Sequence, residues 1–506
     1  MGPQDFTVYD MIRRNAQVFR DRPAVIHDKT TLTFRQYLEG VDSLAAGLAG
    51  LGLAKGERVS ILAQNDPSYL LLYGACAKLG LIAYPINWRL TVEEVGRILE
   101  RAQPRMMAVD AASQALVPGG PGGKQAIPHF YSLGPDPVEG LESLASLMSG
   151  SAAAEPAPVG SDDPFAVIVT AAVDVIPRGA VLTHGNLMAS NLMSLALMGL
   201  NSEDRYLLAL PLYHIAGLGN ALAVMHGGGA NVVMTRFDAE EAVRLIDTHK
   251  VTFVTGFAPI FATLLDAADK AGSNMASLRH ASGLETPDAV RRLIEKTGAC
   301  CWSGFGQSET TGFVSLQRLT DKPGAAGKPA PLCVIKLVDD EDNEVPLGEP
   351  GEILVRGPVV MKEYYGQPDV TAHNFRGGWH HTGDLGRFDE EGYLFYAGRK
   401  PEKELIKPGG ENVYPAEVES VIMEMAGVSG VCVFGVIDPQ WGEAIKAVVE
   451  TKPTEGLTKE KVIDHVGGKI ARFKRPRWVE FTDSLPRTAA GEVDRAAVKT
   501  TWGDKP

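Results

Sequence analysis

Glycines surround three polar residues in the segment "SGFGQSETTG" (303–312), where Gln307, Ser308 and Glu309 follow one another. Glycine lets the backbone approach a bound molecule closely, and a glutamate carboxylate is an oxygen ligand of the kind that Mg²⁺ binds. The pattern therefore indicates contact with a small molecule and its metal ion. Glycine, serine and threonine also make up purely structural turns, so this segment alone leaves both interpretations open.

Two further segments combine turn residues with groups that can hold a ligand. In "WHHTGDLG" (379–386), Asp384 follows a Thr-Gly turn, and its carboxylate can accept hydrogen bonds from two ribose hydroxyls. In "KPGGENVYPAEVE" (407–419), Gly409 and Gly410 stand before an aromatic residue and a helix-starting proline. Each segment by itself is equally explained as an ordinary turn with no binding role.

The residue pattern of a fourth segment, "IVTAAVDVIPRGAVLTHGNL" (168–187), predicts a strand, a tight turn and a capped helix. Loops that hold phosphates at such places present converging backbone amides, hydroxyls and a cation. Here Thr170 keeps a hydroxyl and Arg178 a cation, but alanine, valine and aspartate dominate between them. The segment thus has the frame of a phosphate loop with few of its binding groups.

The composition limits the class of protein. The chain has 506 residues, of which 45% are hydrophobic, 22% are charged and 55 are glycine, which is typical of a large α/β protein with more than one core. Its formal net charge of -13 and pI near 5.4 disfavour a nucleic-acid surface, because phosphate backbones bind through excess lysine and arginine. Five cysteines without metal-binding spacing favour a reducing compartment, so we expect a cytoplasmic protein.

No stretch of the sequence predicts a membrane span or a secretion signal. The most apolar run, Tyr69 to Pro85, contains Lys78 and is shorter than the roughly 20 residues that a spanning helix needs. The N-terminus lacks the apolar core of a signal peptide. We therefore expect the first residues to form an ordinary helix, and the run from Tyr69 to be a core helix that leads into a strand.

The order of apolar runs predicts an α/β fold in two parts. Residues 31–110, and again the chain from 166, alternate helix-like with strand-like stretches, which predicts doubly wound, largely parallel sheets. From 333 onward the sequence is rich in strands and turns and then ends in a small αβ unit. We expect a large N-terminal domain over residues 1–398, made of doubly wound sheets plus a β-rich subdomain, and a small α+β C-terminal domain over residues 399–506.

Taken together and in this order, these segments resemble the adenylate-forming (AMP-binding) superfamily and, within it, the acyl-CoA synthetases or fatty-acid–CoA ligases. The likeness covers nearly the whole chain and includes "LPLYHIAGL" (210–218), "GRKPEKELIKPGGENVYPAEVE" (398–419) and "FKRPRWVEFTDSLPRTAAGEVDR" (473–495). The resemblance implies a two-step reaction. A carboxylate attacks the α-phosphate of ATP to give an acyl-adenylate and pyrophosphate, and after the mobile C-terminal domain has rotated, the thiol of CoA displaces AMP to give the thioester.

The resemblance also implies roles for the residues that would meet the nucleotide. Phe305 would lie against the adenine, and Asp384 would bind the ribose with Arg399 nearby. Ser308 would meet the α-phosphate, and Glu309 would hold Mg²⁺. The further ATP or AMP contacts are expected from Thr170, Arg178, Gly306 and Gln307.

The acid and CoA would be bound by a second set of residues. The acyl pocket would be lined by His214, Phe257, Gly283 and Gly304. The loop of Gly409, Gly410 and Glu411 would face the pantetheine tunnel during the second step. The expected partners are therefore a small-molecule carboxylic acid and CoA, with neither nucleic acid nor a membrane span, in a family where homodimers are common.

The sequence departs from the family pattern in the phosphate loop. The family's Thr-Ser-Gly-Thr-Thr-Gly-x-Pro-Lys-Gly is matched only at Thr170, Pro177 and Gly179, and Arg178 replaces the lysine. Hydrogen bonds to an ionised group contribute roughly 1.5–3 kcal/mol each, so the loss of hydroxyls weakens the hold on phosphate. Asp174 adds repulsion, whereas arginine is a fair cationic substitute.

The second departure lies at the catalytic position of the C-terminal domain. The family's signature Pro-Lys-Thr-x-x-Gly-Lys ends in a lysine that bridges the attacking carboxylate and the α-phosphate, and here "PRTAAGEVDR" (486–495) places Glu492 there. Removing one preorganised electrostatic group costs about a hundred- to a thousandfold in rate, and reversing its charge should cost more. Arg487, Arg495 and Lys499 are the nearby cations that would have to replace the lysine.

These departures leave three interpretations open. The chain is an acyl-CoA synthetase whose adenylation is slow or compensated, acting on an aryl or a medium-to-long acyl acid. Alternatively, it is a non-catalytic or thioester-half-only relative that binds AMP, an acyl-adenylate or acyl-CoA. A purely structural role is disfavoured because Glu309 and Asp384 are retained. Pro401, near the expected hinge, would stiffen the domain rotation in either of the first two cases.

Overall fold

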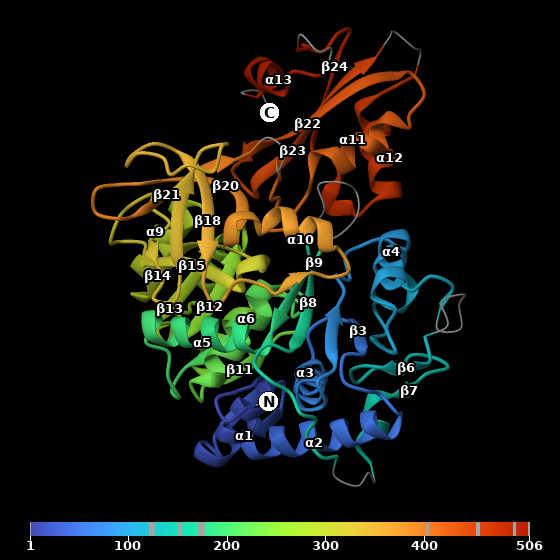
Figure 1. Cartoon of the computed structure of the whole chain (residues 1–506), viewed down its shortest axis with the longest axis vertical. Helices are drawn as coiled ribbons and strands as arrows, with labels where there is room; N and C mark the ends of the chain where they lie inside the picture. Colours follow the sequence, from blue (N-terminus) through green and yellow to red (C-terminus); the bar gives the residue numbers. More distant parts are fainter. Residues whose placement is uncertain are drawn as a thin grey trace.

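The computed structural model describes residues 2–120, 127–149, 154–170, 178–400, 404–451, 456–488 and 492–503. The altered loop residues from Ala171 to Pro177, Asp174 among them, and the expected hinge residue Pro401 lie outside this set. The described residues form four sheets. In Figure 1 the C-terminal residues, orange to red, lie together at one end of the molecule, beyond the two larger sheets.

An eight-stranded sheet comes mainly from the first third of the chain, in the order β19-β9-β8-β4-β3-β5-β6-β7. Strands β3, β4 and β5 pair in parallel, which confirms the prediction for residues 31–110. The strands of this sheet are β3 (Arg58–Leu62), β4 (Ile82–Pro85), β5 (Met106–Val109), β6 (His129–Ser132), β7 (Glu142–Ser143), β8 (Pro164–Thr170), β9 (Arg178–Thr183) and β19 (Glu363–Tyr364).

A nine-stranded sheet follows, in the order β16-β15-β14-β13-β12-β10-β11-β1-β2. Its central strands β11, β10, β12, β13 and β14 are parallel, so the second doubly wound layer is confirmed. Its strands are β1 (Pro23–His27), β2 (Thr30–Thr33), β10 (Arg205–Leu208), β11 (Ala230–Val233), β12 (Phe253–Phe257), β13 (His280–Leu284), β14 (Cys300–Gln307), β15 (Gly312–Arg318) and β16 (Lys328–Pro329).

Helices cover both large sheets, and their ends follow the local sequence. The apolar run from Tyr69 is helix α3: Asp66 caps its start, Pro67 occupies the first turn, and Gly80 ends it in the left-handed conformation with φ +65°. The helices of this part are α1 (Val8–Val18), α2 (Phe34–Gly50), α3 (Pro67–Leu79), α4 (Val92–Ala102), α5 (His184–Met198), α6 (Ile215–His226), α7 (Ala239–His249), α8 (Ile260–Ala271), α9 (Pro287–Thr297) and α10 (Pro368–Asn374). In the part of the chain that the structure describes, no helix is long and apolar enough to cross a membrane.

One hydrophobic core joins the two large sheets. It contains Phe165 from the eight-stranded sheet, Phe253 and Trp302 from the nine-stranded sheet, and Tyr73 of α3 and Leu218 of α6 from the helices between them. This shared core holds the two sheets together and so positions the loops at their edges.

Two smaller sheets complete the fold. The β-rich part is the antiparallel sheet of β17 (Val334–Val338), β18 (Gly351–Arg356), β20 (His380–Phe388) and β21 (Leu394–Arg399). The C-terminal part contains β22 (Val428–Asp438), β23 (Gly442–Thr451) and β24 (Trp478–Thr482) with α11 (Pro415–Met423), α12 (Lys459–Lys469) and α13 (Arg495–Trp502). Its two hydrophobic clusters consist of residues 406–502 alone, which is typical of an independent small domain.

Gly283 in β13 offers a test of this packing. Its φ is +134°, and a Cβ atom there would lie 1.8 Å from the carbonyl oxygen of Gly256. We expect Gly283→Ala to lower the free energy of unfolding by more than about 3 kcal/mol, since backbone would have to move. Gly298→Ala is the matched control, because its φ is +69° with open space around it, and it should cost about 1 kcal/mol. Equal losses in urea unfolding would contradict this account.

Candidate functional site

The carboxylate of Asp384 is the centre of one buried cluster at the edge of the nine-stranded sheet. It accepts hydrogen bonds from Arg399 Nε at 2.8 Å and from the Tyr396 hydroxyl at 3.0 Å, and it also contacts the amide nitrogen of Gln307. Strands β20 and β21 pair Asp384 with Arg399 directly, and β14 ends at Gln307. Burial opposes the charge of Arg399, but Asp384 raises the pKa of the guanidinium. The sequence-predicted residues Gln307, Asp384 and Arg399 are thus brought together.

Phe305 lies beside this cluster. Its ring stacks on that of Tyr396, with 6.3 Å between the ring centroids and an interplanar angle of 27°. A bulge in the β14–β15 pairing falls between Phe305 and Gly306, and a Cβ atom at Gly306 would lie 2.0 Å from the carbonyl oxygen of Gly312. The chain therefore needs glycine at 306 to keep the bulge, and the bulge sets the position of the aromatic ring.

Glu309 and Arg178 flank a third aromatic side chain. The Tyr364 hydroxyl donates to Glu309 Oε1 at 3.1 Å, and the Arg178 guanidinium lies 5.5 Å from the centroid of the Tyr364 ring. Burial, together with the Glu309 charge, raises the pKa of Tyr364, so its hydroxyl stays protonated and donates. Thr170 Oγ1 donates to the Arg178 carbonyl at 3.3 Å and joins the two ends of the altered loop. Ser308 begins the single turn that contains Glu309.

The loop of Gly409, Gly410 and Glu411 belongs to the C-terminal part but is seated on the N-terminal part. Both glycines are left-handed, with φ +58° and +85°. A Cβ atom on Gly410 would lie 2.8 Å from the Phe257 ring, and one on Gly409 would lie 3.1 Å from Trp441. Only glycine allows this backbone to approach the rings so closely.

Glu411 is buried and is held by four side chains of the N-terminal part. Its carboxylate accepts hydrogen bonds from Arg89 at 2.6 Å and from Tyr213 and Asn87 at 3.2 Å each, and it lies 3.5 Å from His214 Nε2. Burial alone would raise the pKa of Glu411, but His214 and then Arg89 lower it to about 2. The carboxylate is therefore ionised at neutral pH and fixes the loop against His214.

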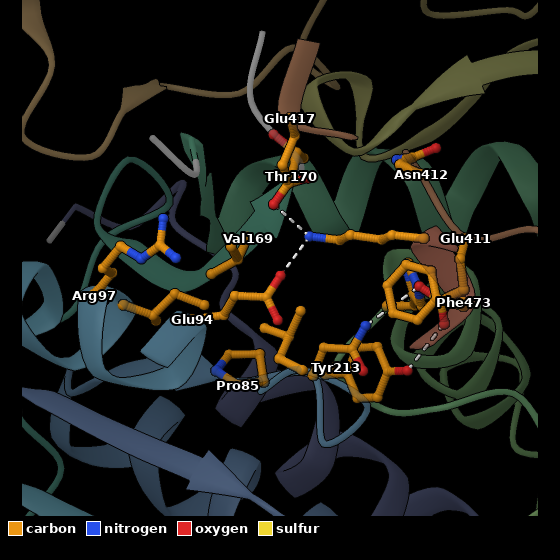
Figure 2. Close-up of a pocket in the computed structure, with 15 residues that line it drawn as sticks. Pro85, Glu94, Arg97, Val169, Thr170, Tyr213, Glu411, Asn412, Glu417 and Phe473 are labelled. Carbon is orange, nitrogen blue, oxygen red and sulfur yellow. Dashed lines mark hydrogen bonds and ion pairs between the residues drawn. The ribbon is translucent and has the colours of Figure 1, made fainter. Parts of the chain in front are cut away.

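The pocket between the two parts is drawn in Figure 2, and it contains a second set of buried charges. Glu94 of α4 points into the pocket, where a dashed line joins it to the ammonium of Lys474 at 2.5 Å. Lys474 also donates to Glu417 of α11 at 2.7 Å. Burial opposes its charge, yet the two carboxylates raise the pKa of Lys474. The rest of the lining includes Arg97, Thr170, Asn412 and Phe473.

Lys407 lies near the Asp384 cluster. Burial, and then the Arg399 charge, lower the pKa of its ammonium, while Asp384, Glu443 and Glu309 act in the opposite direction. A lysine with a lowered pKa beside acidic groups is typical of a functional site.

Glu492 is not part of this arrangement. It is exposed, and its carbonyl accepts a hydrogen bond from the Thr488 amide at 2.8 Å within the C-terminal part. The cations that were expected to replace the lysine are paired elsewhere: Arg495 with Glu404 and Glu419, Lys499 with Glu404, and Arg487 with Glu450. In this domain arrangement none of the three fills the position of the missing lysine.

Several contributors were missed by the sequence analysis. Arg89, Tyr364 and Tyr396 stand in none of the segments that indicate a site, whereas Tyr213, Lys407 and Lys474 lie within such segments but were given no role. A single signal was present for two of them, because Tyr213 adjoins His214 and Lys407 adjoins the glycine loop.

Comparison with known proteins agrees with this geometry. A family model described as AMP-binding enzyme matches residues 12–365, and one described as AMP-binding enzyme C-terminal domain matches residues 417–492. Indoleacetate–CoA ligase of Aromatoleum aromaticum is 34% identical over 97% of both chains. Feruloyl-CoA synthase of an Amycolatopsis species is 32% identical over 97% of this chain and 98% of that one.

Two solved structures named o-succinylbenzoate CoA synthetase, from Bacillus subtilis, allow the domain arrangement to be compared. A double mutant with a bound product analogue matches with a TM-score of 0.85 and 28% identity over 98% of this chain and 99% of that chain. The complex with the acyl-adenylate intermediate matches with a TM-score of 0.71 and 27% identity over 98% of both chains. The arrangement described above is thus closer to the complex with the product analogue.

The charge of Glu411 gives a pH dependence to the seating of the loop. Its pKa is lowered from 4.5 to about 2 in the folded protein, so its contribution is complete above about pH 5 and is lost as the pH falls towards 2. We expect wild type and Glu411→Gln to differ in the urea midpoint of Trp441 fluorescence at pH 7, and this difference to shrink below pH 5. A difference that stays constant with pH would contradict the ionic role.

Proposed function

The chain belongs to the AMP-binding enzyme family and is an AMP-forming acid–CoA ligase, and from this premise we propose the part that each site residue takes in the reaction. The observation that supports the assignments most directly is the seating of Gly410 and Glu411 against Phe257 and His214. It brings the C-terminal domain to the place where the acid would react, while the Asp384 cluster lies beside it. We also propose that the N-terminal domain consists of residues 1–398 and the mobile C-terminal domain of residues 399–506.

The Asp384 cluster is proposed to bind AMP and ATP. Phe305 and Tyr396 offer aromatic faces for the adenine, and Asp384 accepts the ribose hydroxyls in place of Gln307 or Tyr396. Ser308, Thr170 and Arg178 face the phosphates. Arg178 is suited to this because a guanidinium binds phosphate oxygens in pairs.

Glu309 is suited to supply one carboxylate ligand to Mg²⁺. One oxygen of Glu309 accepts the Tyr364 hydroxyl, and the second oxygen has no hydrogen-bond partner among the described residues. Mg²⁺ commonly takes one carboxylate together with substrate phosphates, and there it supplies charge stabilisation for the transferred group. Among the residues that the structure describes, no group of three or more histidines, cysteines, aspartates and glutamates could hold a metal without such a substrate.

The interdomain pocket is proposed to admit the pantetheine arm of CoA. Its lining includes Arg97 of α4, Phe473 of the C-terminal part, and Tyr213, His214 and Glu411. A thiol that follows it would arrive beside His214, where the acyl group would be held near Phe257, Gly283 and Gly304. The two relatives named for indoleacetate and feruloyl acids support an aromatic carboxylic acid as the substrate.

A relative that carries out only the thioester half-reaction is the second candidate. Glu492 and the altered phosphate loop favour it, because both changes remove groups that adenylation uses. A homodimer in the cytosol is proposed for either candidate. The cytosolic placement is supported by the five free cysteines.

Glu492→Lys separates the two candidates. A lysine at 492 should raise acid-dependent exchange of pyrophosphate into ATP by about a hundred- to a thousandfold, since it restores a cation beside the α-phosphate. Glu492→Gln is the matched control and should raise exchange much less, because it removes repulsion without adding a cation. Wild-type exchange above background supports the full ligase. Absent wild-type exchange together with conversion of added acyl-adenylate and CoA to thioester supports the second candidate.

Gly410→Val tests the thioester half alone. The added side chain would meet the Phe257 ring and the backbone would leave its left-handed conformation, so the loop could not seat. We expect thioester formation from acyl-adenylate and CoA to fall at least a hundredfold, while pyrophosphate exchange changes less than threefold. Gly468→Val, in α12 with open space around it, is the control for expression and folding. An equal fall of both half-reactions would show that the loop is needed for more than CoA transfer.

A further inference from the structure

A row of polar side chains crosses the nine-stranded sheet where its face meets α6. Asn220 of α6 donates through Nδ2 to Thr255 Oγ1 at 3.1 Å, and Thr255 Oγ1 lies 3.0 Å from Ser282 Oγ. The Tyr206 hydroxyl lies near Thr255 and Asn220, and it is buried with no hydrogen-bond partner among the described residues. We call Tyr206, Asn220, Thr255 and Ser282 the polar row.

The polar row lies inside the main hydrophobic core. Tyr206, Phe253 and Trp302 share that core with Leu218 and Leu222 of α6. Thr255 stands two residues beyond Phe253 in β12, and alternate residues of a strand share a face. Polar groups are costly in such surroundings unless they serve a ligand or complete a network.

One face of α6 beside the row is partly exposed. In the first half of α6, Ile215, Ala216, Gly219 and Asn220 are partly exposed, whereas Gly217 and Leu218 between them are buried. These four form one stripe, because residues four apart lie on the same helix face. The stripe begins directly after His214, which contacts Glu411. An acyl group with its carboxyl end at His214 would therefore extend along the stripe towards Asn220.

The spacing fits an aromatic acid. Asn220 is six residues beyond His214, which is about 9 Å along a helix. In β12, Thr255 is two residues behind Phe257, or roughly 6.6 Å. These lengths match one aromatic ring with a short linker to its carboxyl group, whereas a long alkyl chain would end against polar atoms.

The hydrogen-bonding capacity of Asn220 decides which group the ring must carry. The amide uses one of its two N–H donors on Thr255, and its Oδ1 has no hydrogen-bond partner among the described residues, so a ligand group that both donates and accepts, such as a phenolic hydroxyl, can satisfy the rest. A carboxamide oxygen accepts hydrogen bonds and cannot donate them. We propose that Asn220 selects aromatic carboxylic acids that carry a hydrogen-bond donor, a phenolic O–H or a ring N–H, at the end remote from the carboxyl group. This specificity rests on the acid–CoA ligase function and on the acyl site proposed above.

The test compares acids that differ only in the donor. Acyl-CoA formation is measured with 4-hydroxycinnamic against cinnamic acid and with 4-hydroxyphenylacetic against phenylacetic acid. We expect the wild type to have a kcat/KM at least tenfold higher for the hydroxylated member of each pair, because the analogue without the hydroxyl leaves the amide oxygen unpaired. Asn220→Leu should abolish or reverse the preference, mainly through KM, and Thr255→Val should reduce it by freeing the amide from its anchor.

Gly219→Ala is the matched control on the same stripe. A Cβ atom there meets only Ile215, at 3.6 Å or more, so the variant narrows the space without changing its polarity. It should alter both members of a pair by the same factor. Wild-type activity with equal kcat/KM for both members, or a preference that survives Asn220→Leu, would overturn the inference and leave the ligase function standing.

Failure of the proposed function has a different signature. It would appear as no thioester from any acid, including hexanoic and palmitic acid, with wild type and Glu492→Lys alike. In that case calorimetric binding of the same acid pairs in the presence of AMP decides the selectivity. A tenfold tighter Kd for the hydroxylated acids that Asn220→Leu removes supports the role of Asn220, and equal Kd values overturn it.

Discussion

The seating of the C-terminal domain depends on keeping one buried carboxylate paired. Glu411 reaches the site only because the two glycines before it adopt left-handed backbone, and it stays charged there because donors of the N-terminal part surround it. Removing these donors together would leave a charge in a place that water does not reach freely, at a cost of several kcal/mol. The position of the loop, the access to His214 and the shape of the pocket in Figure 2 all follow from this pairing.

The second set of buried charges in the pocket is also kept paired. Lys474 neutralises both Glu94 of the N-terminal part and Glu417 of the C-terminal part, so these charges would separate in the proposed rotation of the domain. Buried ion pairs add little net stability, because desolvation offsets most of their attraction. Such an interface is specific in its geometry and yet separates without a large loss of free energy, which suits a domain that must move between two half-reactions.

A structural feature could be predicted from the sequence where the residues that form it lie close together along the chain. The parallel sheets and the Asp384 cluster could be predicted, since strand periodicity is local and Gln307, Asp384 and Arg399 each stand within a short motif. The pairing of Glu94 with Lys474 could not, because 380 residues separate them and nothing in either segment points to the other. Asn220 was missed for another reason: a lone amide in an apolar helix has meaning only once Thr255 is known to lie opposite.

Gly283 illustrates a different limit of prediction from sequence, because its residue type has a backbone cause that is independent of the substrate. The resemblance assigns it to the acyl pocket, yet its positive φ and its contact with the Gly256 carbonyl already require glycine for backbone reasons. Its residue type would therefore be the same with any substrate, and only its neighbours carry information about the acid.

The two departures from the family pattern act on the same half of the reaction. Asp174 and Glu492 both bring negative charge to places where the family has a hydroxyl and a lysine, whereas the surfaces that meet in the present arrangement keep their residues. When the domain turns Glu492 towards the phosphates, repulsion raises the free energy of that arrangement relative to the one in which Glu411 is paired. We propose that this charge pattern favours the present domain arrangement twice, once by pairing Glu411 and once by repelling Glu492 from the phosphates.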